Sequence, residues 1–298
     1  MQAPPSYGIA PPGHRLPDAT QVGTVHLQIA NLARSVAYYV DVIGLRLLEH
    51  SAGHARLGAH GESRTLIALH EFVGARPVAS RGRLGLFHVA ILLPDRASLG
   101  RFLTHLAERH VHAGMSDHLV SEAVYLSDPD GLGLEVYADR PRDQWQTRDR
   151  QLAMSTEPLD VQAVMAAALG IPWSGAPAGT RIGHVHLHVG DLGRASGFYH
   201  DMLGLDKTVW EYPGALFLAA GGYHHHLGTN TWARGAESAR PDDARLIAWT
   251  IEVPSAADVQ AVAASAATHD VHVVTDGDAI VLQDPWGTTV RVRPAIAN

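Results

Sequence analysis

The stretch of sequence that decides the fold is His26-Leu27-Gln28-Ile29-Ala30-Asn31-Leu32, which recurs 160 residues later as His186-Leu187-His188-Val189-Gly190-Asp191-Leu192. Further matches follow without a gap: Tyr39, Asp41, Gly44 and Leu45 correspond to Tyr199, Asp201, Gly204 and Leu205. A match at one fixed offset is the signature of a duplicated structural unit. The sequence therefore predicts two homologous halves, at residues 22–140 and 181–298.

Each half divides again into two units with the same pattern. Residues 24–30 alternate between two faces, as a strand does, and a helical stretch from Leu32 to Val42 ends before Gly44. The second unit repeats a strand, a helix and further strands at Leu86–Leu93, Arg96–Glu108, Leu119–Leu126 and Leu132–Tyr137. We interpret the repeating unit as one strand and one helix, followed by three strands.

A single unit of this kind leaves one face of its sheet bare, so two units must pair. We predict an α+β fold with four βαβββ modules, paired into two cupped mixed β-sheets with the helices outside. The last strand of the second module turns Leu134 and Val136 towards its helix, and Glu135 and Tyr137 to the opposite face. The inner face of the cup is therefore expected to be polar.

The remaining segments are a proline-rich start and a connection between the halves. Residues 1–21 contain five prolines and lack a basic segment followed by an apolar core, so we expect a flexible arm and no secretory signal. Residues 141–180 are predicted to be an ordered linker with a helix near Val161–Leu169. The predicted domains are then residues 22–140 and 181–298, with two modules in each.

Composition limits the classes of partner and site. The chain of 298 residues has 23 Lys and Arg against 30 Asp and Glu, and no basic stripe, so nucleic acid is not expected as a partner. No apolar run is long enough to span a membrane. We therefore expect a cytoplasmic protein. Since the chain has no cysteine, any metal must be bound by nitrogen and oxygen ligands.

The 20 histidines make imidazole the natural place to look for chemistry. The candidate metal ligands are His88 and Glu135 in the second module, together with His26 or His186, which open the first and third modules. Two imidazoles and a carboxylate form a facial triad with open coordination positions. In the fourth module Ala248 and Arg291 replace His88 and Glu135. We therefore expect one complete site per chain.

A run of three histidines, His224-His225-His226, follows two glycines in the third module. As a polar strand it would turn alternate imidazoles to opposite sides, so at least one would face the cup and could move protons. The first module has no imidazole at the corresponding position. This difference favours the third module as partner of the second, and His186 over His26 as the third ligand.

Several motifs resemble those of the two-domain catechol 2,3-dioxygenases of the vicinal-oxygen-chelate (VOC) superfamily, which includes glyoxalase I and the bleomycin-resistance proteins. The resemblance spans about residues 22–295. It is carried by Gly85–Pro94 (GLFHVAILLP), Ser116–Ala123 (SDHLVSEA), Gly133–Pro141 (GLEVYADRP), Gly183–His188 (GHVHLH) and Gly221–His226 (GGYHHH). It implies a VOC fold for both domains.

The resemblance also implies the roles of individual residues. Extradiol dioxygenases bind Fe(II) through two histidines and a glutamate, which places His88, His186 and Glu135 in the metal site. Their acid–base histidine aligns with His225. Two further residues that contact substrate oxygens align with His118 and Tyr125.

The expected function is therefore extradiol cleavage of a catechol-type aromatic diol with Fe(II) and O2. Mn(II) is the alternative metal. Two other functions are weighed against it: a metal-dependent isomerase or lyase of the glyoxalase type, whose sites usually have four protein ligands, and a metal-free protein that binds drugs. The latter leaves His88 and Glu135 unexplained. The ring substituents and the existence of a homo-oligomer stay open.

Overall fold

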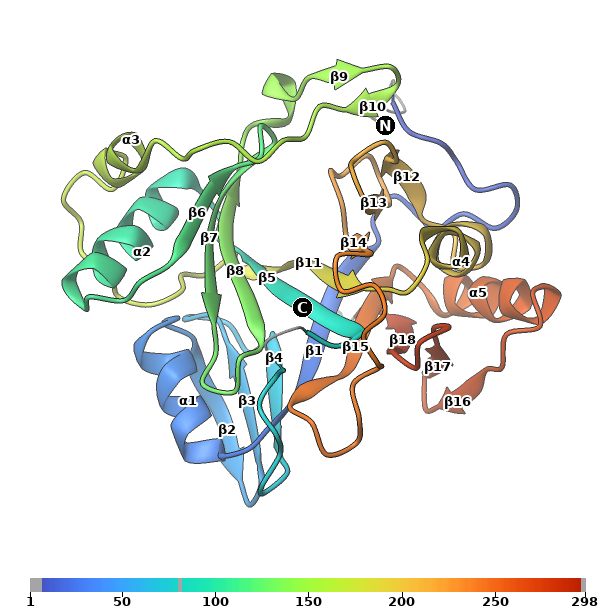
Figure 1. The fold of residues 1–298 in the computed structure, drawn as a ribbon, viewed down its shortest axis with the longest axis horizontal. Helices are drawn as coiled ribbons and strands as arrows, with labels where there is room; N and C mark the ends of the chain where they lie inside the picture. The colour runs from blue at the N-terminus through green and yellow to red at the C-terminus, as the bar shows by residue number, and fades with distance from the viewer. Residues whose placement is uncertain (1–6, 80–81, 296–298) are drawn as a thin grey trace.

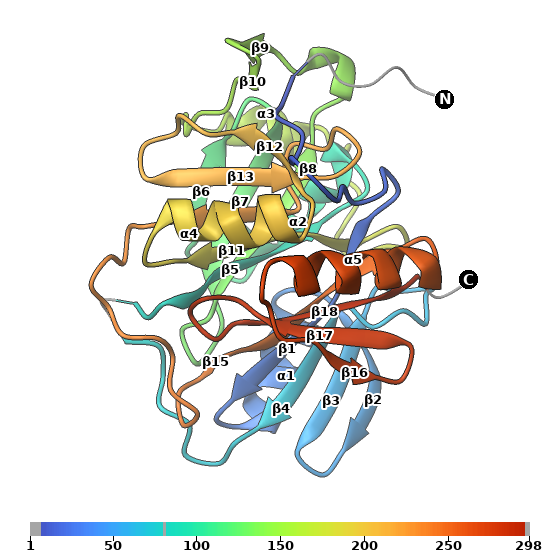
Figure 2. The ribbon, with the colours of Figure 1, turned by 90° about the vertical axis from the view of Figure 1, so that its right-hand side faces the viewer.

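Two mixed β-sheets of eight strands each form the body of the protein in the computed structural model, which describes residues 7–79 and 82–295 (Figure 1). In Figure 2 the strands of one sheet, built from the second and third modules, lie above those of the other, built from the first and fourth modules. We call them sheet A and sheet B. The predicted α+β fold, with modules that form two curved sheets, is confirmed.

Sheet A contains the strands of the second and third modules. Its order is β12 (Asp206–Val209), β13 (Ala215–Ala219), β14 (Leu227–Asn230), β11 (Arg181–His188), β5 (Gly85–Leu92), β8 (Gly133–Asp139), β7 (Ser121–Ser127) and β6 (Gly114–Asp117). Sheet B contains the first and fourth modules. Its order is β16 (Val274–Asp276), β17 (Ala279–Gln283), β18 (Thr289–Pro294), β15 (Arg245–Val253), β1 (Gln21–Ile29), β4 (Ile67–Glu71), β3 (His54–Gly58) and β2 (Arg46–Ser51).

One helical segment follows the first strand of each module. The four segments are α1 (Leu32–Asp41), α2 (Arg96–Glu108), α4 (Leu192–Ser196), continued by the π-helical η2 (Gly197–Met202), and α5 (Ala256–Thr268). None of the helices in the described parts of the chain is long and apolar enough to cross a membrane. The linker holds η1 (Arg142–Gln144), β9 (Thr147–Arg148), β10 (Gln151–Leu152) and α3 (Val161–Ala166).

The modules pair across the linker. In sheet A the first strand of module two, β5, runs antiparallel to the first strand of module three, β11. In sheet B, β1 and β15 pair in the same way. The predicted domains 22–140 and 181–298 therefore describe the sequence repeat but not the sheets, because each half contributes one module to each sheet. The pairing of the second module with the third, which the three-histidine run favours, is observed between β5 and β11.

Alternation along the strands separates an apolar core from the polar face. Val89 and Ile91 of β5 are fully buried in the main hydrophobic core, where Phe102 of α2 is also found. His88 and Ala90, the alternating residues, turn to the concave face of sheet A. The central strands of the two sheets also contact each other, so the core continues between the sheets.

Residues 7–20 are packed against the third module and the linker, so the predicted flexible arm is wrong for this segment. Ile9 forms a bridge with Lys207, and the Tyr7 hydroxyl donates a hydrogen bond to the carbonyl of Gly222 (2.8 Å). Leu16 is 1 % exposed. The burial of this apolar side chain and the main-chain hydrogen bonds hold the segment. Residues 1–6 of the predicted arm lie outside the described residues.

The Asp-Pro turns that precede β8 and β18 are held by buried carboxylates. Asp128 accepts hydrogen bonds from the backbone N–H groups of Asp130 and Leu132 (both 2.9 Å) and from the Tyr39 hydroxyl (3.3 Å). Burial raises the pKa of Asp128 to about 6. Asp284 makes the equivalent bonds in the fourth module.

We expect Asp128→Ala to lower the free energy of unfolding by about 3 kcal/mol, because it leaves two backbone donors and a buried hydroxyl without their acceptor. Urea unfolding followed by circular dichroism measures this change. Asp143→Ala, at an exposed position, is the control and should change stability little. Equal unfolding midpoints for the two variants would contradict the assignment.

Candidate metal centre

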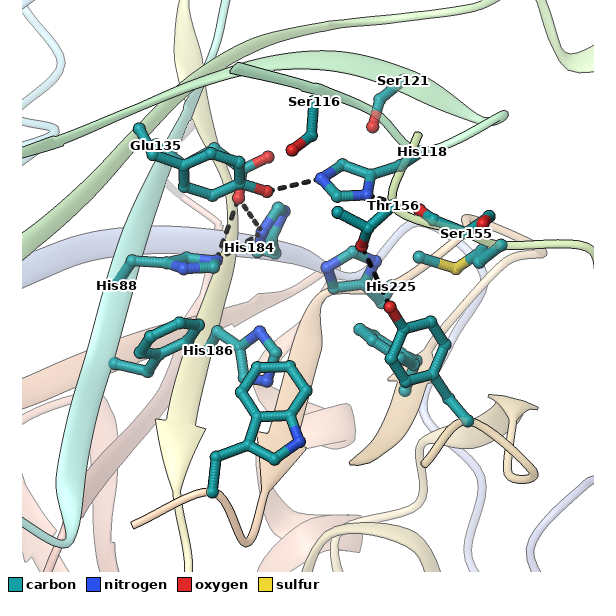
Figure 3. A pocket seen from close by; sticks show the side chains of 16 residues that line it. His88, Ser116, His118, Ser121, Glu135, Ser155, Thr156, His184, His186 and His225 are labelled. Carbon is teal, nitrogen blue, oxygen red and sulfur yellow. Dashed lines mark hydrogen bonds and ion pairs between the residues drawn. The ribbon is translucent and has the colours of Figure 1, made fainter. Parts of the chain in front are cut away.

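The concave face of sheet A holds a cavity of about 330 Å³ (Figure 3). Its polar wall comes from β5, β8, β11 and the segment before β14. This wall includes His88, Glu135, His184, His186 and His225. The cavity therefore lies where three central strands of two modules meet.

Three of these side chains form a tight group, which we call the His–His–Glu cluster: His88, His184 and Glu135 (Figure 3). Glu135 Oε2 lies 2.9 Å from His88 Nε2 and 3.2 Å from His184 Nε2, and the two imidazole nitrogens are 3.2 Å apart. The three residues are 5 %, 2 % and 2 % exposed, in the order His88, His184, Glu135. Within the described residues, no other group of His, Cys, Asp and Glu is close enough to share a metal ion.

Strand register brings the cluster together. His184 of β11 and Glu135 of β8 are both direct neighbours of Ala90 on the central strand β5. The small Ala90 side chain leaves room above it for the three longer ones, and His88 stands two residues along the same strand. A bulge at Gly183 sets this register. A Cβ atom at position 183 would lie 1.8 Å from the Tyr137 hydroxyl, so glycine is required there.

The protonation states of the cluster fit a divalent cation. Burial alone would raise the pKa of Glu135, but the neighbouring imidazoles of His184 and His88 hold that pKa well below its ordinary value. Burial lowers the pKa of His184 to about 4, against the opposing effect of Glu135. The cluster thus offers an ionised carboxylate and a neutral imidazole, which are the forms that bind metals.

A buried negative charge also needs a compensating positive one. Among the described residues, no lysine or arginine forms an ion pair with Glu135, whose ion-pair partners are His88 and His184. A metal ion would supply the missing charge. The donor set of two nitrogens and one carboxylate oxygen fits such an ion and leaves positions for other ligands.

The structure differs from the sequence prediction at the third ligand. His186 on β11 is the cross-strand neighbour of His88 on β5, with ring centroids 5.0 Å apart, but it lies outside the cluster. Its Nε2 atom accepts a hydrogen bond from Asn230 Nδ2 (3.0 Å). His26 lies in sheet B, 3.0 Å from His70 between Nδ1 and Nε2.

The 160-residue repeat indicates His186 and not His184 as a candidate ligand on β11. His184, His186 and His188 share one face of β11, so alternation alone does not separate them. At the 160-residue offset His186 matches His26, whereas His184 matches Thr24. What distinguishes His184 from His186 is the register between β11, β5 and β8, which places His184 level with Glu135.

His118 and Tyr125 lie together on the cavity wall. His118 Nδ1 is 2.7 Å from the carbonyl of Ser155 and therefore carries the proton. Its Nε2 atom accepts a hydrogen bond from the Tyr125 hydroxyl (2.5 Å). Burial and the charge of Glu135 raise the pKa of Tyr125 well above its ordinary value. Tyr125 is also the cross-strand neighbour of Glu135, so this pair lies beside the cluster.

The three-histidine run is a loop that leads into β14 and not the expected strand. Gly221 and Gly222 have φ values of +60° and +61°, which turn the chain away from extended geometry. Of the three imidazoles, His225 lines the cavity, and its ring centroid lies 4.0 Å from that of His184. His226 lines a separate cavity.

A chain of hydrogen bonds fixes the tautomer of His225. His224 Nε2 lies 2.8 Å from Asp139 Oδ1, so this nitrogen carries the proton. His224 Nδ1 is then an acceptor, and it lies 2.8 Å from His225 Nδ1, which must donate. His225 Nε2 is left without a proton and can act as a base.

Comparison with known proteins agrees with the module pattern. The family model described as "Glyoxalase/Bleomycin resistance protein/Dioxygenase superfamily" matches residues 21–136 and 181–292. The chain belongs to this superfamily. Each matched segment covers two of the four modules, as expected for a superfamily member built from a duplicated pair.

A curated relative is similar over most of its length. It is the catechol-2,3-dioxygenase of Bacillus subtilis (strain 168), which is 44% identical over 249 residues, or 82% of this chain and 86% of the relative. This identity shows a close relationship within the superfamily.

Solved structures share the superfamily fold. A Bacillus subtilis protein provisionally described as a dioxygenase superposes with a TM-score of 0.67 at 14% identity, covering 96% of this chain and 87% of that one. Glyoxalase I from Zea mays superposes with a TM-score of 0.54 at 17% identity, covering 93% and 92%. At such identities these structures support the fold alone.

In this superfamily member, aromatic side chains surround the cluster. They are Phe87, Tyr125, Tyr212, Phe217 and Trp232. Phe87 and Trp232 contact each other edge to face, with centroids 5.5 Å apart. Flat apolar walls beside a polar cluster suit a planar ring that carries polar groups at one edge.

Proposed function

We propose that the protein is an extradiol ring-cleaving dioxygenase that acts on catechol-type diols with Fe(II) and O2. The observation that carries the proposal is the buried His–His–Glu cluster at the base of an aromatic cavity. The 44% identity to a catechol-2,3-dioxygenase over most of the chain supports the same reaction. A metal-free binding role leaves the ionised Glu135 without a function.

We propose His88, His184 and Glu135 as the residues that would hold Fe(II). The bound metal would supply positions for the two diol oxygens and O2, and would stabilise the charge that develops on them. The protein side chains then have to orient the ring, exclude water and move protons.

His225 is positioned to move the diol proton. Its unprotonated Nε2 is set by the chain from Asp139 through His224, and the imidazole lies beside His184 on the cavity wall. Burial and the surrounding imidazoles lower the pKa of His225 well below its ordinary value, which keeps the free site in the base form. After accepting the proton, His225 can return it to the product as general acid.

The hydrogen-bonded pair of His118 and Tyr125 lines the same cavity. His118 lies in the loop before β7, and Tyr125 lies on β7. The Tyr125 hydroxyl can donate to a substrate oxygen once it turns away from His118 Nε2. The walls formed by Phe87, Phe217 and Trp232 would hold the ring and keep water from the reacting oxygens.

The test is anaerobic loading with Fe(II), followed by catechols and O2. We expect a yellow ring-opened product with consumption of O2 in proportion to substrate. A parallel sample loaded with Mn(II) tests the alternative metal. Bound metal without O2 consumption across a panel of catechols would contradict the proposal and favour an isomerase or lyase. A protein that binds no metal would favour the binding function.

A further inference from the structure

Sheet B carries a second cavity on its own concave face, and this cavity is rich in positive charge. Its volume is about 550 Å³. Four arginines line it, against the single carboxylate of Glu252. The arginines are Arg56, Arg64, Arg291 and Arg293. The remaining lining is formed largely by hydroxyl-bearing residues, and, apart from His26, it has none of the aromatic rings that line the sheet A cavity.

The internal repeat shows how this cavity differs from the metal centre. Arg291 of β18 is the register partner of Thr250, in the same way that Glu135 of β8 is the partner of Ala90. A guanidinium therefore stands where the metal centre has its carboxylate. The positions of His184 and His88 are taken by Thr24 and Ala248. Sheet B has thus lost all three groups of the cluster and reversed the charge at one of them.

Three of the four guanidiniums are available to a ligand. Arg64 is engaged with the nearly buried Glu252, at 2.6 Å. Arg56, Arg291 and Arg293 pair instead with Glu49, Asp276 and Asp278, whose side chains are 52%, 57% and 65% exposed. Exposed ion pairs contribute only about 0–1 kcal/mol. An anion inside the cavity can therefore replace these carboxylates as the partner of the arginines at a small cost in free energy.

We propose that the concave face of sheet B binds a small polar dianion with carboxylate or phosphate groups. Planar guanidiniums bind both groups through two parallel hydrogen bonds. The volume of about 550 Å³ suits a small molecule. The scarcity of aromatic walls separates this ligand from a catechol, so the site is distinct from the proposed catalytic one.

The test is isothermal titration of the Fe(II)-loaded protein with glycerol phosphate and, separately, with succinate. We expect saturable binding of at least one of them, and the two titrations show which anionic group is preferred. The Arg291→Gln/Arg293→Gln variant should weaken binding by about tenfold or more. Arg240→Gln removes a guanidinium from an exposed ion pair outside the cavity and should leave the affinity unchanged.

Two further variants keep the result interpretable. Arg56→Gln changes an exposed side chain and should weaken binding even where the double variant fails to fold. His184→Ala, which disrupts the cluster in sheet A and is titrated without Fe(II), should bind the dianion as the unaltered protein does. No saturable binding of either anion would overturn the proposal. Equal weakening in Arg240→Gln, or loss of binding in His184→Ala, would overturn it as well.

Discussion

His184→Ala is expected to abolish Fe(II) binding and, with it, ring cleavage. The substitution removes one of three side chains that meet at Glu135, and it leaves the buried carboxylate with His88 alone. Loss of a residue that merely supports a metal ligand costs about 10- to 100-fold in metal affinity or activity, so loss of a ligand should exceed about a hundredfold. Metal content after dialysis and O2 consumption are the two measurements.

His186→Ala is the matched control on the same strand. Because its Nε2 is engaged by Asn230 and its side chain is outside the cluster, the variant should keep its metal. The reverse outcome, with metal lost from His186→Ala and kept in His184→Ala, would restore the assignment expected from the sequence. Circular dichroism of both variants shows that the comparison is made between folded proteins.

His225→Phe is expected to retain the metal but lose about 10²- to 10⁴-fold in kcat, which is the range for removal of a general acid–base group. The phenyl ring replaces the imidazole against His184 and Phe217 without a proton acceptor. Steady-state O2 consumption at saturating catechol, together with the metal content, separates loss of proton transfer from loss of the metal.

The neighbouring histidines provide graded controls. His224→Gln breaks the hydrogen-bond chain between Asp139 and His225, so it should lower kcat by less than His225→Phe does. His226→Asn should have little effect, because His226 accepts a hydrogen bond from the backbone of Ala220 and lines a different cavity. Normal kcat in His225→Phe, or an equal loss in His226→Asn, would exclude His225 as the base.

The sequence by itself determined the modules and the polarity of the cup. The internal repeat and its strand alternation are local properties of the sequence, seen in His26–Leu32 and His186–Leu192. The folded protein has strands β1 and β11 at the start of these stretches. For the same reason His88 and Glu135 could be predicted to face the concave side of their strands: side-chain direction in a strand follows from position alone. The reversal from Glu135 to Arg291 was also visible in the aligned repeat.

Only the tertiary structure decided which β11 histidine meets Glu135 and which imidazole of the three-histidine run lines the cavity. The choice among the β11 histidines depends on the register between strands distant in the sequence, which includes the bulge at Gly183. The path of the loop before β14 brings His225 to the cavity. Strand alternation alone does not distinguish His184, His186 and His188. Their proximity to Glu135 depends on the register between β11 and β5. Local sequence fixes the side of a strand on which a residue lies, but long-range packing fixes its neighbours.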